Sequence, residues 1–151
     1  MSDVDDQVPA PPPVPVRFVL IDPAGTLEVR EADGTAEPDD WGDLYQARLW
    51  AAVAEAVDPH RRQVTTVALE HNLWLRVVDL PPAPGPQLYR LYPANPTAWA
   101  MVTALGGPDG QWRGPVAITG AEDDEGVSAS LADHQLALVT DAHRRARRPH
   151  R

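Results

Sequence analysis

The densest group of side chains with metal-binding chemistry is an acidic run late in the chain. Glu122, Asp123 and Asp124 are followed by Glu125 and Gly126, and carboxylate oxygens are the ligands that hard cations prefer. The run lacks the alternating acids and the terminal glutamate of an EF-hand loop. We therefore interpret it as a solvated loop, in which Glu122, Asp123 and Asp124 are the candidate cation ligands.

The rest of the sequence offers no further metal or cofactor motif. The chain has no cysteine, which excludes disulfides and thiolate metal sites. Its five histidines are scattered, and none forms an HExxH pattern or a histidine–carboxylate set at metal-binding spacing. We expect the protein to carry no cofactor.

Positive charge is concentrated at the end of the chain. Residues 1–142 hold all 22 acids and 8 arginines, a net charge of −14, whereas residues 143–151 hold five arginines and no acid. These five are Arg144, Arg145, Arg147, Arg148 and Arg151. They are candidates for contact with an acidic partner or a nucleic-acid backbone. We favour the alternative that they complement a helix C-terminus, because the acidic body repels phosphate.

Length and composition predict one domain between two terminal segments. A chain of 151 residues supports a single domain with a substantial core. Residues 1–15 are rich in proline and aspartate, so we expect disorder there, with a PxxP ligand as the alternative. The domain should span residues 16–142, followed by a basic tail at 143–151. No apolar run is long enough for a membrane span and the N-terminus has no basic signal region, so we expect a cytoplasmic protein.

The pattern of apolar residues predicts an α+β fold. We expect a small sheet, mixed or mostly antiparallel, of about five or six strands with three helices. The predicted strands are residues 16–22, 27–30, 64–69, 73–80, 88–92 and 116–119. The predicted helices are residues 41–57, 96–105 and 131–145. Acidic or proline-rich loops are expected at residues 31–40, 81–86 and 121–129.

The predicted helices have recognisable starts. Apolar residues at helical spacing from Trp41 onward predict the first helix. Asn95 and Pro96 are favoured at the N-cap and first position of the second, and the cap should stabilise it by about 1 kcal/mol. Gly106 suits the left-handed residue that ends this helix. Ser130 is the expected N-cap of the third.

One stretch resembles a motif of phosphate-transferring enzymes. Residues 18–27, FVLIDPAGTL, are similar to the first motif of haloacid-dehalogenase-type phosphatases. The resemblance implies that Asp22 is a nucleophile at a strand end, within a doubly wound sheet. Ala24 stands where that family usually has its general acid, and the chain has no lysine to steady the phosphate. A strand–turn–strand unit explains the same residues.

The order of several short motifs resembles a second family. LIDPAGTLEV, NPTAWAMVTALGG and GPVAITGAEDDEGVSASL precede the final helix. This order is similar to that of the family catalogued as domain of unknown function 3846, whose members occur in actinobacteria, phages and plasmids. The resemblance implies no activity. Our leading hypothesis is a non-enzymatic accessory or binding protein; the alternatives are a phosphohydrolase using Asp22 and a contact through the arginine-rich tail.

Overall fold

The computed structural model describes residues 13–58, 60, 63–81 and 83–147. These residues form two sheets and four helices. The strands are β1 (Pro15–Ile21), β2 (Leu27–Asp33), β3 (Glu37–Pro38), β4 (Leu44–Tyr45), β5 (Val64–Ala68), β6 (Leu73–Val78) and β7 (Val116–Gly120). The helices are α1 (Ala47–Val57), α2 (Gly85–Leu91), α3 (Pro96–Ala104) and α4 (Asp133–Ala146).

The main sheet has five strands in the order β2-β1-β7-β6-β5, and every neighbouring pair is antiparallel. It consists of two hairpins, β1–β2 and β5–β6, joined by β7. Ile118 in the middle of β7 pairs with Val19 of β1 on one side and with Leu75 of β6 on the other. The predicted α+β class is confirmed. Of the two predicted alternatives, mixed or mostly antiparallel, the main sheet is antiparallel throughout; a small β3–β4 ladder is present in addition, and there are four helices where three were predicted.

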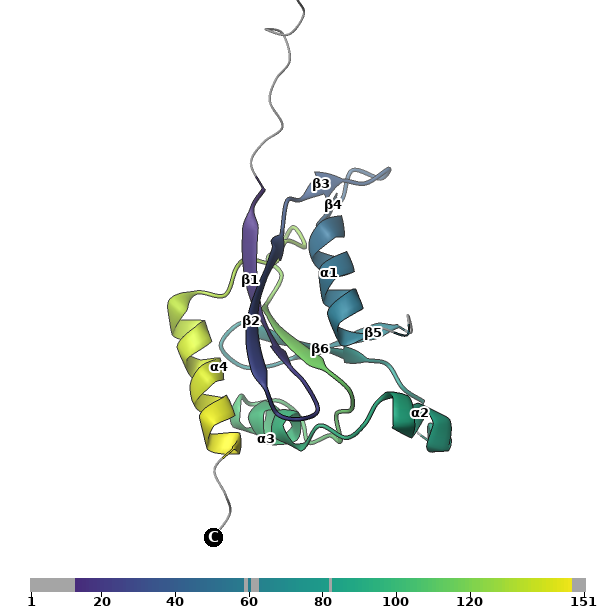
Figure 1. Ribbon diagram of the computed structural model, residues 1–151. Helices are drawn as coiled ribbons and strands as arrows, with labels where there is room; N and C mark the ends of the chain where they lie inside the picture. Colours follow the sequence, from purple (N-terminus) through teal and green to yellow (C-terminus); the bar gives the residue numbers. More distant parts are fainter. Residues whose placement is uncertain (1–12, 59, 61–62, 82, 148–151) are drawn as a thin grey trace, which may run out of the picture.

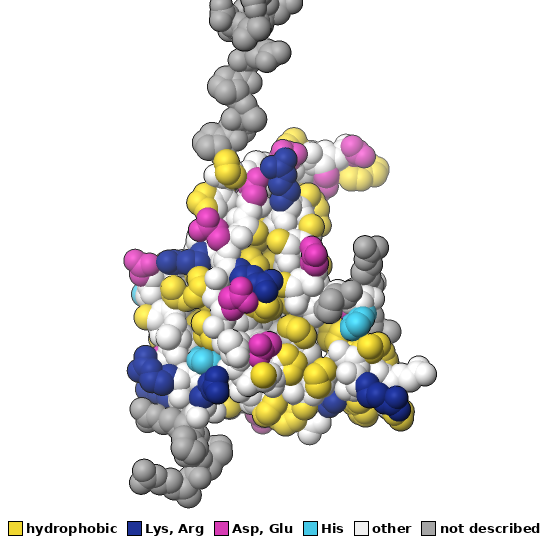
Figure 2. All heavy atoms as spheres, in the orientation of Figure 1, with side chains coloured by type: hydrophobic (Ala, Val, Ile, Leu, Met, Phe, Trp, Pro, Cys, Tyr) yellow, Lys and Arg dark blue, Asp and Glu magenta, His cyan; other side chains and the backbone are white. Residues whose placement is uncertain are grey.

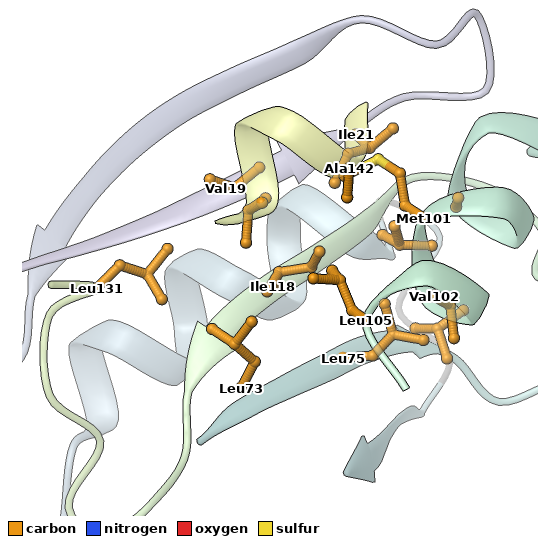
Figure 3. Close-up of a cluster of buried hydrophobic side chains, with 14 of the residues drawn as sticks. Val19, Ile21, Leu73, Leu75, Met101, Val102, Leu105, Ile118, Leu131 and Ala142 are labelled. Atoms are coloured by element: carbon orange, nitrogen blue, oxygen red, sulfur yellow. The ribbon is translucent and has the colours of Figure 1, made fainter. Parts of the chain in front are cut away.

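Helices cover both faces of the sheet (Figure 1). One face packs against α1, whose buried residues Leu49, Val53 and Val57 meet a cluster that includes Phe18 and Leu20 of β1. The other face packs against α3 and α4. Figure 3 shows side chains from β1, β6, β7, α3 and α4 meeting in this second layer. The burial of these aliphatic side chains is the main force that holds the layers together.

Asn95 ties α3 to the sheet. As predicted, it is the N-cap of α3, and its Oδ1 accepts a hydrogen bond from the amide of Ala98 at 3.1 Å. Its Nδ2 also donates to the carbonyls of Ile21 at 3.1 Å and Gly114 at 2.9 Å. The side chain is fully buried. Asn95 therefore joins the end of β1 to the turn before β7, a role beyond capping.

The first helix begins later than the predicted Trp41. Oδ1 of Asp39 accepts hydrogen bonds from the amides of Trp41 and Asp43, and Gly42 has a positive φ of 84°. This turn joins β3 to β4, so Trp41 is 89% exposed and α1 starts at Ala47. The helical spacing at residues 41–45 was misleading because local side-chain bonding stabilises a turn there.

The predicted strand at residues 88–92 is wrong, because Gly85–Leu91 form α2. This short helix also takes the last two residues of the loop predicted at 81–86. Pro86 is at the start of the helix, where its missing amide costs nothing. The guanidinium of Arg113 stacks over the ring of Tyr89 at 4.1 Å, which holds α2 against the segment before β7.

Two other boundaries differ from the sequence-based expectation. β2 continues to Asp33 and β3 follows it, so the loop predicted at residues 31–40 contains strand structure. The last helix starts at Asp133 with Ala132 as N-cap, because the hydroxyl of Ser130 instead accepts a hydrogen bond from the Arg17 amide. Among the described residues, no helix is long and apolar enough to cross a membrane.

Candidate functional site

A charged residue lies in the middle of β6. Side chains alternate between the two faces of a strand, and Leu73, Leu75 and Val77 of β6 belong to the core under α3 and α4. The alternation places Arg76 on the α1 face, where it is only 7% exposed. A buried arginine needs compensating partners, because removing its charge from water is costly.

The Arg76 guanidinium is held by two hydrogen bonds and two aromatic rings. Its Nε donates to the Thr119 hydroxyl on β7 at 3.2 Å, and its Nη1 donates to the Thr66 hydroxyl on β5 at 2.7 Å. The guanidinium carbon lies 4.1 Å from the ring centre of Trp50 on α1 and 5.0 Å from that of Trp74 on β6. These contacts fix the plane of the guanidinium between the helix and the sheet.

One nitrogen of Arg76 has no hydrogen-bond acceptor. Nη2 is buried, and the nearest carboxylate oxygen, Oε1 of Glu122, lies 3.7 Å away, beyond hydrogen-bonding distance. Burial lowers the pKa of Arg76, and the charge of Glu122 opposes this effect. Arginine still remains protonated at neutral pH. The site therefore holds a buried guanidinium that is paired with Glu122 only across a long contact.

Arg76 lines a groove between α1 and the β5–β6 hairpin. The groove has a volume of about 460 Å³, within the range of small-molecule sites. Its polar lining comes from Arg76, Thr66 and Tyr45. The remaining lining residues are Ala47, Trp50, Ala51, Val53, Ala54 and Val64. We call this cavity the Arg76 groove; it combines one cation with a mostly apolar wall.

A second cavity lies beside the opposite face of β5. It has a volume of about 270 Å³, and its lining includes Thr65, Val77, Tyr89, Trp112 and Arg113. Thr65 and Thr66 are consecutive residues of β5, so their side chains point to opposite faces of the sheet. β5 thus separates the Arg76 groove from this second cavity.

Asp22, the candidate nucleophile, closes the turn between β1 and β2. Its Oδ1 accepts a hydrogen bond from the Thr26 amide at 2.9 Å, and its backbone pairs with Thr26 and Gly25. Nε2 of His143 donates to the Gly25 carbonyl at 2.7 Å, which attaches α4 to this turn. The antiparallel sheet differs from the doubly wound sheet that the phosphatase resemblance implies.

The acidic run is organised by its own backbone. Oδ1 of Asp123 accepts hydrogen bonds from the amides of Glu125 at 2.8 Å and Val127 at 3.0 Å. Glu122 instead pairs with Arg76 at 3.7 Å. Across the described parts of the chain, no three histidine or acidic side chains are arranged to hold a metal ion.

The described arginines of the C-terminal group lie at the end of α4 (Figure 2). Arg144 and Arg145 both pair with Asp141, at 3.6 Å and 3.0 Å. Nη1 of Arg147 donates to the Gly25 carbonyl at 3.2 Å. Arg148 and Arg151 lie outside the described residues. α4 continues to Ala146, so residues 143–146 of the expected tail belong to a packed helix.

The chain matches no family model, no curated protein and no solved structure. The site therefore has to be judged on its own chemistry. The structure brings together Trp50, Thr66, Trp74, Arg76 and Glu122, and of these only Glu122 was a candidate from the sequence. The available signal was a single charged residue inside the apolar run LWLRVV.

Proposed function

We propose that the protein is a non-enzymatic binding protein and that the Arg76 groove receives a carboxylate group of its partner. One observation carries this proposal: a buried arginine whose Nη2 has no hydrogen-bond acceptor lines an open groove. The resemblance to the family of domain of unknown function 3846, which implies no activity, is compatible with it.

The guanidinium is suited to a carboxylate by its geometry. Arginine presents five N–H donors in a rigid plane, and two of those of Arg76 are used by Thr119 and Thr66. The donors that remain on Nη1 and Nη2 form the fork that binds the two oxygens of a carboxylate. Because Trp50 and Trp74 already fix this plane, little side-chain entropy is lost on binding.

Two groups have to move when the carboxylate binds. Nη2 is covered in the free protein, so a covering side chain must move before a carboxylate can reach it. Glu122 is the internal competitor: it pairs with Arg76 at 3.7 Å, and the ligand carboxylate displaces it. The ligand carboxylate replaces a long ion pair with two charge-assisted hydrogen bonds.

The proposal is tested by titrating the protein with glutarate and following the indole N–H signals by NMR. We expect the signals of Trp50 and Trp74 to shift, with assignments from Trp50→Phe and Trp74→Phe. Arg76→Lys should abolish the shifts, because lysine lacks the planar fork. Arg113→Lys is the matched control, since Arg113 also stacks on an aromatic ring but lines the second cavity.

Thermal melting of each variant shows whether it is folded. Glutarate titrations that leave both indole signals unmoved, or that are the same in wild type and folded Arg76→Lys, would refute the proposal.

A further inference from the structure

We infer that the partner presents its carboxylate on an extended peptide segment, which adds to β5 as a sixth, antiparallel strand of the sheet. This inference rests on the proposed function, because the carboxylate it places is the one bound by Arg76.

Among the described residues, the edge of β5 away from β6 pairs with no other strand. The Asp79 amide donates to the Gln63 carbonyl at 2.7 Å, and the Leu69 amide donates to the Leu73 carbonyl at 2.9 Å. Hydrogen-bonded pairs alternate along an antiparallel ladder. Odd-numbered residues of β5 therefore point their amides and carbonyls toward β6. The amides and carbonyls of Val64, Thr66 and Ala68 point outward.

The two edges of the sheet differ in how they resist added strands. β2, at one edge, has the sequence LEVREAD and carries the charged residues Glu28, Arg30, Glu31 and Asp33. Charged side chains on an edge strand discourage pairing with other chains. β5, at the other edge, has the sequence VTTVA, and its register with β6 runs without a bulge. Within Val64–Ala68 the structure shows no charged residue, no proline and no bulge.

The cavities on either side of β5 match the side-chain alternation of an added strand. A residue placed opposite Thr66 has its Cβ about 5 Å from that of Thr66, on the same face. Arg76 reaches that face through its 2.7 Å hydrogen bond to the Thr66 hydroxyl. The neighbouring residues of the added strand point to the other face, toward the cavity lined by Thr65 and Trp112. This pattern fits one acidic residue flanked by apolar residues.

Charge complementarity favours an acidic segment over a second copy of this chain. If two copies paired symmetrically about Thr66, each Arg76 would face the uncharged β5 strand of the other molecule. No carboxylate from that strand would then reach Nη2. An acidic residue opposite Thr66 instead places a carboxylate beside the guanidinium, whose Nη1 already reaches the Thr66 hydroxyl.

Fluorescence anisotropy with a labelled, capped peptide Thr-Val-Glu-Val-Thr tests the inference. Replacing its glutamate by glutamine, or methylating the glutamate amide, should each weaken binding at least about tenfold, which corresponds to ~1.4 kcal/mol. The glutamate amide faces β5 in the expected register. Methylating the amide of the first valine should change affinity less than about twofold, because that amide points away from β5.

A protein variant tests the edge separately from the groove. Ala68→Pro removes an outward amide and leaves the ladder with β6 intact, as proline on an edge strand allows. We expect it to lose the peptide at least about tenfold, ~1.4 kcal/mol, while it still binds glutarate. Melting curves confirm that it is folded.

The outcomes separate the two proposals. Three results together would overturn the strand addition alone. Glutarate binding would depend on Arg76, the peptide would bind no more tightly than glutarate, and neither Ala68→Pro nor either methylation would change the affinity for the peptide. Absence of any Arg76-dependent binding overturns both. A concentration-dependent dimer in analytical ultracentrifugation that Ala68→Pro abolishes would assign the β5 edge to a second copy and would also overturn the inference.

Discussion

Replacing Asn95 by alanine should destabilise the protein by more than the loss of a helix cap. The substitution removes three hydrogen bonds, one from the Ala98 amide and two to the carbonyls of Ile21 and Gly114. Each bond contributes about 1 kcal/mol, and leaving the buried partners unsatisfied adds to the loss. We expect a decrease in unfolding free energy of about 3–5 kcal/mol, against about 1 kcal/mol for a cap alone.

Urea denaturation followed by circular dichroism measures this difference. Thr97→Ala is the matched control, because it changes the same turn of α3 and leaves all three bonds of Asn95 in place. Asn95→Ser separates the roles, since serine can accept from the helix amide but cannot reach both carbonyls. If Asn95→Ala and Asn95→Ser differ little, and both cost about 1 kcal/mol or less, the attachment of α3 to the sheet is not energetically important.

Three further predictions concern the core, acid stability and the end of α4. Ile118→Ala should cost about 2–5 kcal/mol in the same urea assay because Ile118 is fully buried, and a near-wild-type midpoint would contradict its central position. Hydrogen bonds from Thr35, and then the contact with Arg48, hold the pKa of Asp33 well below its ordinary 3.8. The stability that ionised Asp33 contributes is therefore complete above its ordinary pKa of 3.8 and is lost as the pH falls from there toward the lowered pKa of the folded protein. Asp33→Asn should therefore flatten the fall in melting temperature below about pH 4. Truncation after Ala142 removes the contacts of His143 and Arg147 with Gly25 and should lower the melting temperature, whereas truncation after Arg147 should not.

The sequence was sufficient where local chemistry and tertiary packing agree. The strand before Asp22, the β5–β6 hairpin, the Asn95 cap and Gly106, with its positive φ of 78°, were predicted correctly. Each of these features depends on residues close together in the chain. The start of α1 was missed because the bonds of Asp39 outweigh the helical spacing of the following residues.

The candidate site could not be assembled from the sequence, because its members are far apart in the chain. Trp50, Arg76 and Glu122 come from a helix, a strand and a loop. Only the strand order places them together, and strand order is not encoded in local patterns. Trp74 lies close to Arg76 in the chain, but its stacking on the guanidinium depends on where the side chains of β6 are packed.

The position of β7 has a consequence for the synthesis of the protein. β7 is the last strand of the main sheet to leave the ribosome, and it fills the gap between β1 and β6. Before it is made, the inner edges of β1 and β6 lack partners. Such edges favour association between nascent chains. A fragment that ends before Val116 should therefore fail to form the sheet, so trimming this protein from its C-terminal side through β7 yields no shorter domain.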